Sequence, residues 1–188
     1  YLMKQMAIFA SGSGTNAENI ISYFTENHKF KVVLLCSNHA NAMVVERAKR
    51  NAIPVLTFTS NELKNSSKVL ESLKHFNVSI VILAGFLLKI PDSLIQMFPN
   101  AIINLHPSLL PKYGGKGMFG INVHRAVIEN DEIESGITIH YVNENYDEGA
   151  IIFQATCIVD SDDNPWTLQK KIQILEHAHF PKVIDRLF

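Results

Sequence analysis

The chain has 188 residues, of which 47% are hydrophobic and 19% are charged, and its formal net charge is −1. This length and composition are typical of a globular protein with one hydrophobic core. The near-neutral charge, without a long basic run, argues against nucleic acid or an anionic membrane surface as a partner. The apolar stretches are too short to span a bilayer.

The first half of the sequence alternates apolar, strand-like runs with amphipathic, helix-like runs. Residues 30–36 form a continuous apolar run, which is typical of a strand buried on both faces. The expected strands are 5–10, 30–36, 54–58, 79–84 and 101–106, and the expected helices are 17–25, with Asn16 as its cap, 41–50, 66–76 and 91–98. This alternation predicts an α/β fold with a Rossmann-like, mostly parallel sheet flanked by helices.

The second half of the sequence predicts a smaller set of elements. A glycine-rich loop over 113–120 precedes a helix over 121–129, and strands over 137–142 and 150–158 are joined by 143–149 in a predicted β-hairpin. Asn164 and Pro165 are typical of a helix start, so they open a final helix, which Pro181 is expected to kink or end. Leu168, Ile172 and Leu175 are its predicted buried stripe. We expect one domain over 1–188, with halves of about 1–100 and 101–188.

Cysteine usage and the first residues bear on the cellular compartment. Cys36 and Cys157 lie in apolar, strand-like runs, which favours free buried thiols over a disulfide. The first residues lack the charged start, apolar middle and cleavage site of a signal peptide. We therefore expect a cytoplasmic location. No His-x-x-x-His or Cys-x-x-Cys pair occurs, so we expect no metal site.

Asn104 and His106 form the most informative pair in the sequence. Residues i and i+2 of a strand point to the same face, so this carboxamide and this imidazole should emerge together while Leu105 points into apolar packing. Pro107 should end the strand because it cannot donate to a sheet ladder. The carboxyl ends of strands are where open α/β sheets bind ligands. A hydrogen-bond donor beside a titratable base suits acyl transfer.

Residues 11–17 form a glycine turn between the first strand and the first helix. Gly12, Gly14 and Ala17 fit the dinucleotide-binding spacing, but the second strand ends without the acidic residue that would bind a ribose. A phosphate-binding turn therefore fits better than a nicotinamide site, because glycines and helix-start amides favour an anion. A tight strand-to-helix connection without a ligand is the alternative.

Two further titratable residues allow two interpretations each. From the residues alone, Asp147 is a solvated carboxylate in a turn; alternatively it folds over the site, orients His106 and raises the pKa of that imidazole. His140 either supports the site or is a core histidine with satisfied hydrogen bonds.

Several motifs together resemble the phosphoribosylglycinamide formyltransferase family, within the folate-dependent formyltransferases. The glycine turn resembles the start of that family, and the Asn-x-His-Pro-Ser-Leu-Leu-Pro run resembles its central motif. The remaining matching motifs are 83–87, 136–142, 147–152, 154–155 and 176–178, so the likeness runs in order from about Met6 to Leu187.

The resemblance implies that 10-formyltetrahydrofolate, as a co-substrate, donates its formyl group to the amine of glycinamide ribonucleotide in purine synthesis, without a metal. Asn104, His106 and Asp147 match the catalytic positions of the family. The implied ribonucleotide contacts are Gly12, Ser13, Gly14, Thr15, Asn16 and Glu176, and the implied folate contacts are Leu87, Leu88, Lys89, Ile90, Asn104, Asn143, Glu144 and Asp147. The first half would then bind the nucleotide phosphate, and the second half would bind folate and carry the catalytic residues.

Three alternatives are weighed against this interpretation. A formyltetrahydrofolate deformylase uses a similar trio with water as the acceptor, but the phosphate turn favours a nucleotide substrate. A methionyl-tRNA formyltransferase fits less well because no basic surface for tRNA is predicted. The third alternative is a nucleotide-binding module without catalytic activity.

Overall fold

The structure is a computed structural model that describes residues 3–188, and it divides into two compact units, one ending at Ile103 and the other spanning Asn104–Phe188. The strands are β1 (Lys4–Phe9), β2 (Phe30–Ser37), β3 (Val55–Thr57), β4 (Ile80–Leu83), β5 (Ile102–His106), β6 (Glu134–Tyr141) and β7 (Ile151–Ile158). The helices are α1 (Thr15–Asn27), α2 (Met43–Arg50), α3 (Ser60–Asn65), α4 (Ser67–His75), α5 (Asp92–Met97), α6 (Ile121–Glu129) and α7 (Pro165–Leu187). The strands are hydrogen bonded in the order β3-β2-β1-β4-β5-β6-β7. The predicted α/β class is confirmed.

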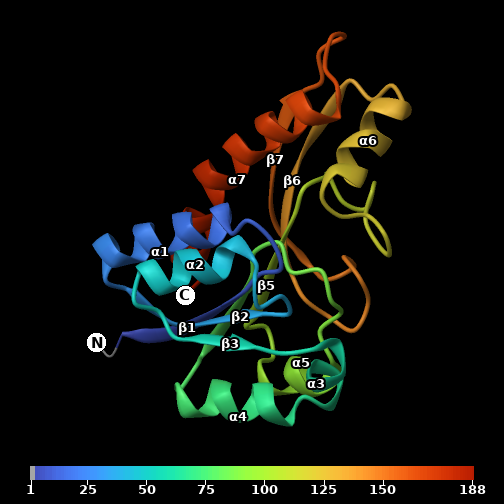
Figure 1. Ribbon diagram of the computed structural model, residues 1–188. Coiled ribbons are helices and arrows are strands. Elements are labelled where there is room, and N and C mark those ends of the chain that lie inside the picture. The colour runs from blue at the N-terminus through green and yellow to red at the C-terminus, as the bar shows by residue number, and fades with distance from the viewer. Residues whose placement is uncertain (1–2) are drawn as a thin grey trace. The chain divides into compact units, whose positions relative to one another are not determined.

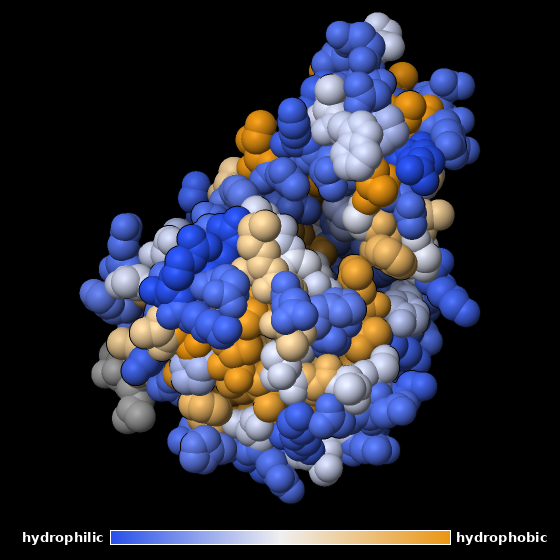
Figure 2. All heavy atoms as spheres, viewed as in Figure 1, coloured by the Kyte–Doolittle hydropathy of each residue, from blue (hydrophilic) through white to orange (hydrophobic). Residues whose placement is uncertain are grey.

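The first unit is a parallel sheet with helices on both faces. β1 pairs in parallel with β2 and β4, and β2 pairs in parallel with β3. All four residues of β4 are buried, as the continuous apolar pattern predicts for a central strand. Helices α1 and α2 lie on one face, and α3, α4 and α5 lie on the other (Figure 1). α2 buries Val44, Val45 and Ala48 and presents hydrophilic side chains to solvent (Figure 2).

The second unit combines a β-hairpin with the long last helix. β6 and β7 pair antiparallel, with a register shift between Ile139 and His140. Helix α7 packs against both strands and against α6. Among residues 3–188, no helix has the length and apolar character that crossing a membrane requires.

Pro181 does not end the last helix, which continues to Leu187. A proline inside a helix removes one backbone hydrogen bond and costs about 3 kcal/mol. Phe180, Val183 and Ile184 flank it and are all buried. Burying each such side chain contributes about 1.5–3 kcal/mol, so packing outweighs the cost of the proline. The predicted end at this residue is therefore wrong.

Four local features differ from the expectations. Helix α1 begins at Thr15 with Gly14 at its N-cap, so Asn16 is not the cap. Helix α3 was not predicted, although Thr59 and Glu62 form a capping box at its start. Cys157 is only half-buried, unlike Cys36, and both thiols are free. Leu175 is likewise half-buried, whereas Leu168 and Ile172 are fully buried in the predicted stripe.

Gly14 is expected to be essential for stability because its backbone has φ of +77° and a Cβ there would lie 2.3 Å from Cγ2 of Val44. Gly14→Ala should lower the free energy of unfolding by about 2 kcal/mol or more, from left-handed strain and overpacking together. Urea unfolding followed by circular dichroism measures this. The matched control is Gly12→Ala, whose Cβ would meet nothing within 4 Å. Equal loss in the two variants would contradict the prediction.

Candidate active site

Asn104 and His106 lie at the carboxyl end of β5, where the sequence places them. His106 is buried, with 4% of its surface exposed, and Leu105 between them is buried too. Asn104 Nδ2 lies 3.4 Å from Asp147 Oδ1, and His106 Nδ1 lies 3.5 Å from Asp147 Oδ2. Both side chains therefore point to the same carboxylate, which confirms that they share one face of the strand.

Asp147 lies in the connection between β6 and β7 and is not a solvated turn residue. Only 12% of its side chain is exposed, and the Gly115 backbone N–H donates to Oδ2 at 2.9 Å. Its φ of +55° is uncommon for a residue with a side chain. The connection thus folds the carboxylate inward, so the interpretation from the residues alone is wrong for this position.

The two ring nitrogens of His106 have different partners. Nε2 lies 2.8 Å from the carbonyl oxygen of Tyr113, and a carbonyl only accepts, so Nε2 carries a proton. Nδ1 faces Asp147 Oδ2. In this arrangement Nε2 anchors the ring, and Nδ1 is the nitrogen that can gain or lose a proton.

Burial dominates the ionisation of His106. Desolvation lowers the pKa of His106, and this effect outweighs the opposing influence of the Asp147 carboxylate and of the bond to Tyr113. From the sequence, Asp147 is expected to raise the pKa of His106. The carboxylate does act in that direction, but the net pKa of His106 is lowered. The error arises because burial cannot be judged from residue spacing.

The pKa of Asp147 is set by opposing effects. Burial alone would raise it, but the neighbouring His140 and His106 imidazoles and the Gly115 N–H together lower the pKa below its ordinary value. Asp147 is therefore a carboxylate at neutral pH, placed between two donors.

His140, for which the sequence left two interpretations, belongs to the site. Its Nδ1 donates to the carbonyl of Tyr141 at 2.8 Å, so Nε2 is left to accept from Asn104 Nδ2 at 3.1 Å. The ring is buried and fixes the orientation of the Asn104 amide. The signal in the sequence is its alternation on β6, which gives it the same face as Thr138.

Thr138 and Gln154 are structural parts of the site that the sequence analysis missed. Thr138 Oγ1 donates to the carbonyl of Ser108 at 2.7 Å and accepts from the Leu110 N–H at 3.0 Å. Gln154 Nε2 donates to Thr138 Oγ1 at 2.9 Å and to the carbonyl of Leu110 at 3.1 Å. Two neighbouring strands thereby hold the segment that follows His106. Thr138 and Gln154 pair across the hairpin, which is a signal that appears only once the register is known.

The glycine turn lies in the first unit and is held from one side by α2. The Val44 N–H donates to the carbonyl of Gly12 at 3.1 Å, and Arg47 Nε donates to the carbonyl of Ser13 at 2.9 Å. Arg47 also pairs with Glu18. The start of an α-helix favours an anion, so the beginning of α1 beside this turn can serve one. Arg47 was missed because it is distant in sequence from the turn.

The segment after β4 meets the same turn. The Leu87 N–H donates to Ser11 Oγ at 3.0 Å, and Ser11 Oγ donates to Asn38 Oδ1 at 2.6 Å. Leu87 and Lys89 are exposed and Leu88 is half-buried, whereas Ile90 is only 3% exposed. The side chain of Ile90 therefore belongs to the core, and only its backbone can face a ligand.

The other predicted contacts lie in the second unit. Asn143 and Glu144 are exposed in the connection that carries Asp147, and Glu176 is half-buried on α7. The second unit thus brings together Asn104, His106 and Asp147. Within residues 3–188, no group of three or more His, Cys, Asp or Glu side chains is arranged to hold a metal ion.

Comparison with known proteins shows a likeness along the whole chain. The family described as formyl transferase matches residues 4–184. A chloroplastic phosphoribosylglycinamide formyltransferase of Arabidopsis thaliana is 40% identical over 98% of this chain, which spans 65% of that relative. A phosphoribosylglycinamide formyltransferase of Bacillus subtilis is 37% identical, with 98% of this chain and 95% of the relative covered. The crystal structure of phosphoribosylglycinamide formyltransferase from Bacillus halodurans is 35% identical with a TM-score of 0.90, covering 98% of this chain and 95% of that one.

Proposed function

Because the chain belongs to the formyl transferase family, we propose that it transfers the formyl group of 10-formyltetrahydrofolate to the amine of glycinamide ribonucleotide, a step of purine biosynthesis. The observation that carries the proposal is that Asp147 lies 3.4 Å from Asn104 Nδ2 and 3.5 Å from His106 Nδ1, the two polar side chains at the carboxyl end of β5. Names of relatives that span almost the same length support the choice of substrates.

The proposed chemistry begins with the lone pair of the substrate amine attacking the formyl carbon, which moves the carbonyl electrons onto oxygen. Asn104 Nδ2 and His106 Nδ1 both point to the anionic oxygens of Asp147 in this structure. When His106 is protonated at Nδ1 as well as at Nε2, both groups are donors, and an arrangement of donors that accommodates a carboxylate also suits the oxyanion of a tetrahedral intermediate. Losing one such donor typically costs a factor of about 10²–10³ in turnover.

Collapse of the intermediate restores the carbonyl and breaks the bond to the folate nitrogen. The attacking amine loses one proton and the departing nitrogen gains one, so no net proton is consumed. Asp147 and Nδ1 of His106 are placed to relay this proton, with Nε2 of His106 anchored on Tyr113. Side chains and water account for each step, so the proposed route uses no metal.

The proposed binding roles fall to separate groups of residues. We assign the ribonucleotide phosphate to the glycine turn (Gly12, Ser13, Gly14, Thr15 and Asn16) in the first unit and the ribose hydroxyls to Glu176. We assign folate to residues 87–90 and to Asn104, Asn143, Glu144 and Asp147. Both partners are small molecules, and the proposed compartment is the cytoplasm.

A spectroscopic transfer assay tests the proposal. Purified protein is mixed with 10-formyltetrahydrofolate, with and without glycinamide ribonucleotide, and release of tetrahydrofolate is followed. We expect release only when the ribonucleotide is present, together with formylated ribonucleotide as product. Release that is independent of the ribonucleotide would identify a deformylase, and no release under either condition would support the non-catalytic alternative.

A further inference from the structure

We propose that Glu132, which lies between α6 and β6, positions the imidazole of His106 through Tyr113 and Lys112. We call Lys112, Tyr113 and Glu132 the Glu132 clamp. The inference deepens the proposed function and rests on it for the kinetic test, whereas the structural test below stands independently of the reaction.

The carbonyl of Tyr113 is the anchor of the His106 ring, at 2.8 Å from Nε2. Tyr113 has a φ of +56°, in the left-handed region that residues with side chains rarely adopt. Such a conformation persists only where the surroundings hold it. Whatever holds Tyr113 therefore also determines where its carbonyl points.

Glu132 binds both residues of this segment. Its Oε1 accepts from the Tyr113 hydroxyl at 2.9 Å and from Lys112 Nζ at 2.8 Å, and its Oε2 accepts from Lys112 Nζ at 3.1 Å. The Glu132 side chain is 24% exposed, whereas that of Lys112 is 65% exposed. The bond to the tyrosine is thus the better shielded of the two, because exposed ion pairs are weakened by solvent.

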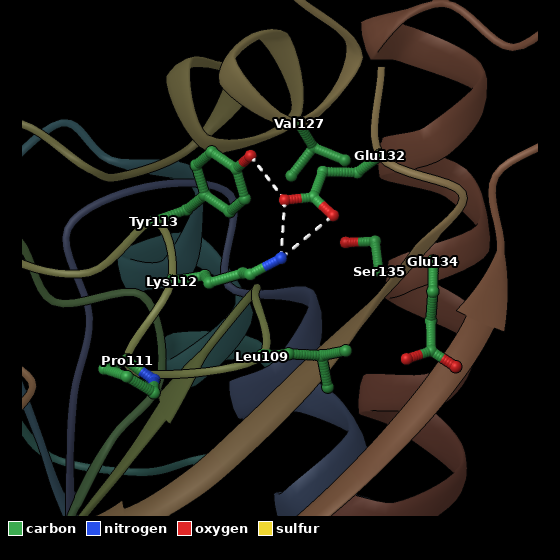
Figure 3. Close-up of a pocket in the computed structure, with 8 residues that line it drawn as sticks. All are labelled: Leu109, Pro111, Lys112, Tyr113, Val127, Glu132, Glu134 and Ser135. Atoms are coloured by element: carbon green, nitrogen blue, oxygen red, sulfur yellow. Dashed lines mark hydrogen bonds and ion pairs between the residues drawn. The ribbon is translucent and has the colours of Figure 1, made fainter. Parts of the chain in front are cut away.

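A cavity of about 280 Å³ borders the clamp. Figure 3 shows the Glu132 carboxylate between the Tyr113 hydroxyl and the Lys112 ammonium group, with Val127 and Ser135 beside it. Because open volume lies next to the Tyr113 ring, side-chain packing alone does not fix the ring. The hydrogen bond to Glu132 supplies the missing restraint.

The backbone of the segment is tied at its other end as well. Ser108 Oγ donates to the carbonyl of Lys112 at 2.7 Å. Hydrogen bonds therefore connect Glu132 to the Tyr113 hydroxyl and the Tyr113 carbonyl to the His106 imidazole. If Glu132 is removed, the Tyr113 backbone can relax, its carbonyl can turn away, and Nε2 loses its acceptor. The ring then no longer holds Nδ1 toward Asp147.

Nitrogen NMR of the substrate-free protein tests this directly. The chain is labelled with ¹⁵N-histidine, and the His106 signals are assigned by their loss in His106→Gln. In the unmodified chain we expect a single tautomer with the proton on Nε2. In Glu132→Ala we expect the His106 signals to shift toward a mixture of tautomers. Glu132→Gln keeps an acceptor for the Tyr113 hydroxyl and should restore the original signals.

The same spectra followed against pH give a second readout. The bond to Tyr113 raises the pKa of His106, so its loss in Glu132→Ala should lower that pKa further. Asp147, His140 and His124 are the other titratable groups that act on His106 or its neighbourhood, and none of them is altered by the substitution. The pKa of the imidazole should therefore report the clamp alone.

Kinetics give the third readout. Glu132→Ala should lower kcat by about tenfold, the size of one lost hydrogen bond in the transition state, and leave KM for both substrates within about twofold. The matched control is Glu134→Gln, which alters a carboxylate on the same cavity wall that makes none of the clamp bonds. This control should match the unmodified chain in both spectra and kcat.

If Glu132→Ala fails to fold, as judged by circular dichroism, Tyr113→Phe removes only the hydroxyl and carries the same test. Unchanged His106 signals and an unchanged His106 pKa in the folded variant would overturn the proposal. If the His106 signals shift in Glu132→Ala but the unmodified chain transfers no formyl group, the clamp is supported and the proposed reaction is contradicted. Failure of the clamp and failure of the proposed function are therefore distinguishable.

Discussion

Replacing His106 with alanine should nearly abolish formyl transfer while glycinamide ribonucleotide still binds with an affinity within a few-fold of the original. The imidazole has a ring nitrogen, Nδ1, that can exchange a proton beside a carboxylate, at 3.5 Å from Asp147 Oδ2. General acid–base groups of this kind contribute about 10²–10⁴ to turnover. This range corresponds to about 3–5 kcal/mol of transition-state stabilisation.

Two measurements separate catalysis from binding in this variant. Single-turnover transfer rates report the chemical step, and isothermal titration calorimetry reports the Kd for the ribonucleotide. We expect the rate to fall and the Kd to stay nearly constant, because the proposed phosphate contacts lie in the glycine turn. A loss confined to binding would contradict the assigned role.

His106→Gln refines the test because His106 is buried and alanine leaves a cavity. The glutamine amide can still donate to the Tyr113 carbonyl, but it cannot take up a proton at neutral pH. It should therefore keep the fold and remain almost as inactive as the alanine variant. His75→Ala, at an exposed histidine in the last turn of α4, is the matched control and should transfer at the original rate.

The parts of the fold that could be predicted from the sequence are those whose residues carry a local pattern. β4 could be predicted as a strand because its four residues form a continuous apolar run, and the structure buries all four. Asn104 and His106 could be placed on one face because strand periodicity is strict. Helix α3 was missed because it buries only Leu63, so its hydrophobic pattern is weak and a capping box marks its start instead.

The parts of the site that could not be predicted depend on backbone groups or on burial. The Tyr113 carbonyl and the Gly115 N–H each bind a proposed catalytic side chain, yet every residue type has such groups, so no sequence pattern singles them out. Arg47 contacts the glycine turn although it lies 34 residues after Ser13 in the sequence, so no local pattern connects the two. The lowered pKa of His106 follows from desolvation, which requires the packed structure.

Replacing Asp147 with asparagine should lower kcat by about 10²–10⁴, as expected when the carboxylate that orients a catalytic histidine is lost. Both carboxylate oxygens face donors: Oδ2 accepts from the Gly115 N–H and faces His106 Nδ1, and Oδ1 faces Asn104 Nδ2. Asparagine offers one acceptor and one donor. Its NH₂ group must therefore face either the Gly115 N–H or the Asn104 NH₂ group, and both of these are donors. The substitution thus misaligns the site while changing the size of the side chain very little.

The pH profile shows whether Asp147 also acts on the ionisation of His106. The carboxylate opposes the effect of burial, so its loss should lower the pKa of His106 further. If the imidazolium form takes part in transfer, activity falls as pH rises through that pKa, and this descending limb should move to lower pH in Asp147→Asn. Glu148→Gln, an exposed neighbour that also removes one negative charge, controls for general electrostatics and should leave the limb in place. A reduced rate with an unmoved limb would mean that Asp147 only orients the donors, whereas equal shifts in both variants would assign the effect to net charge.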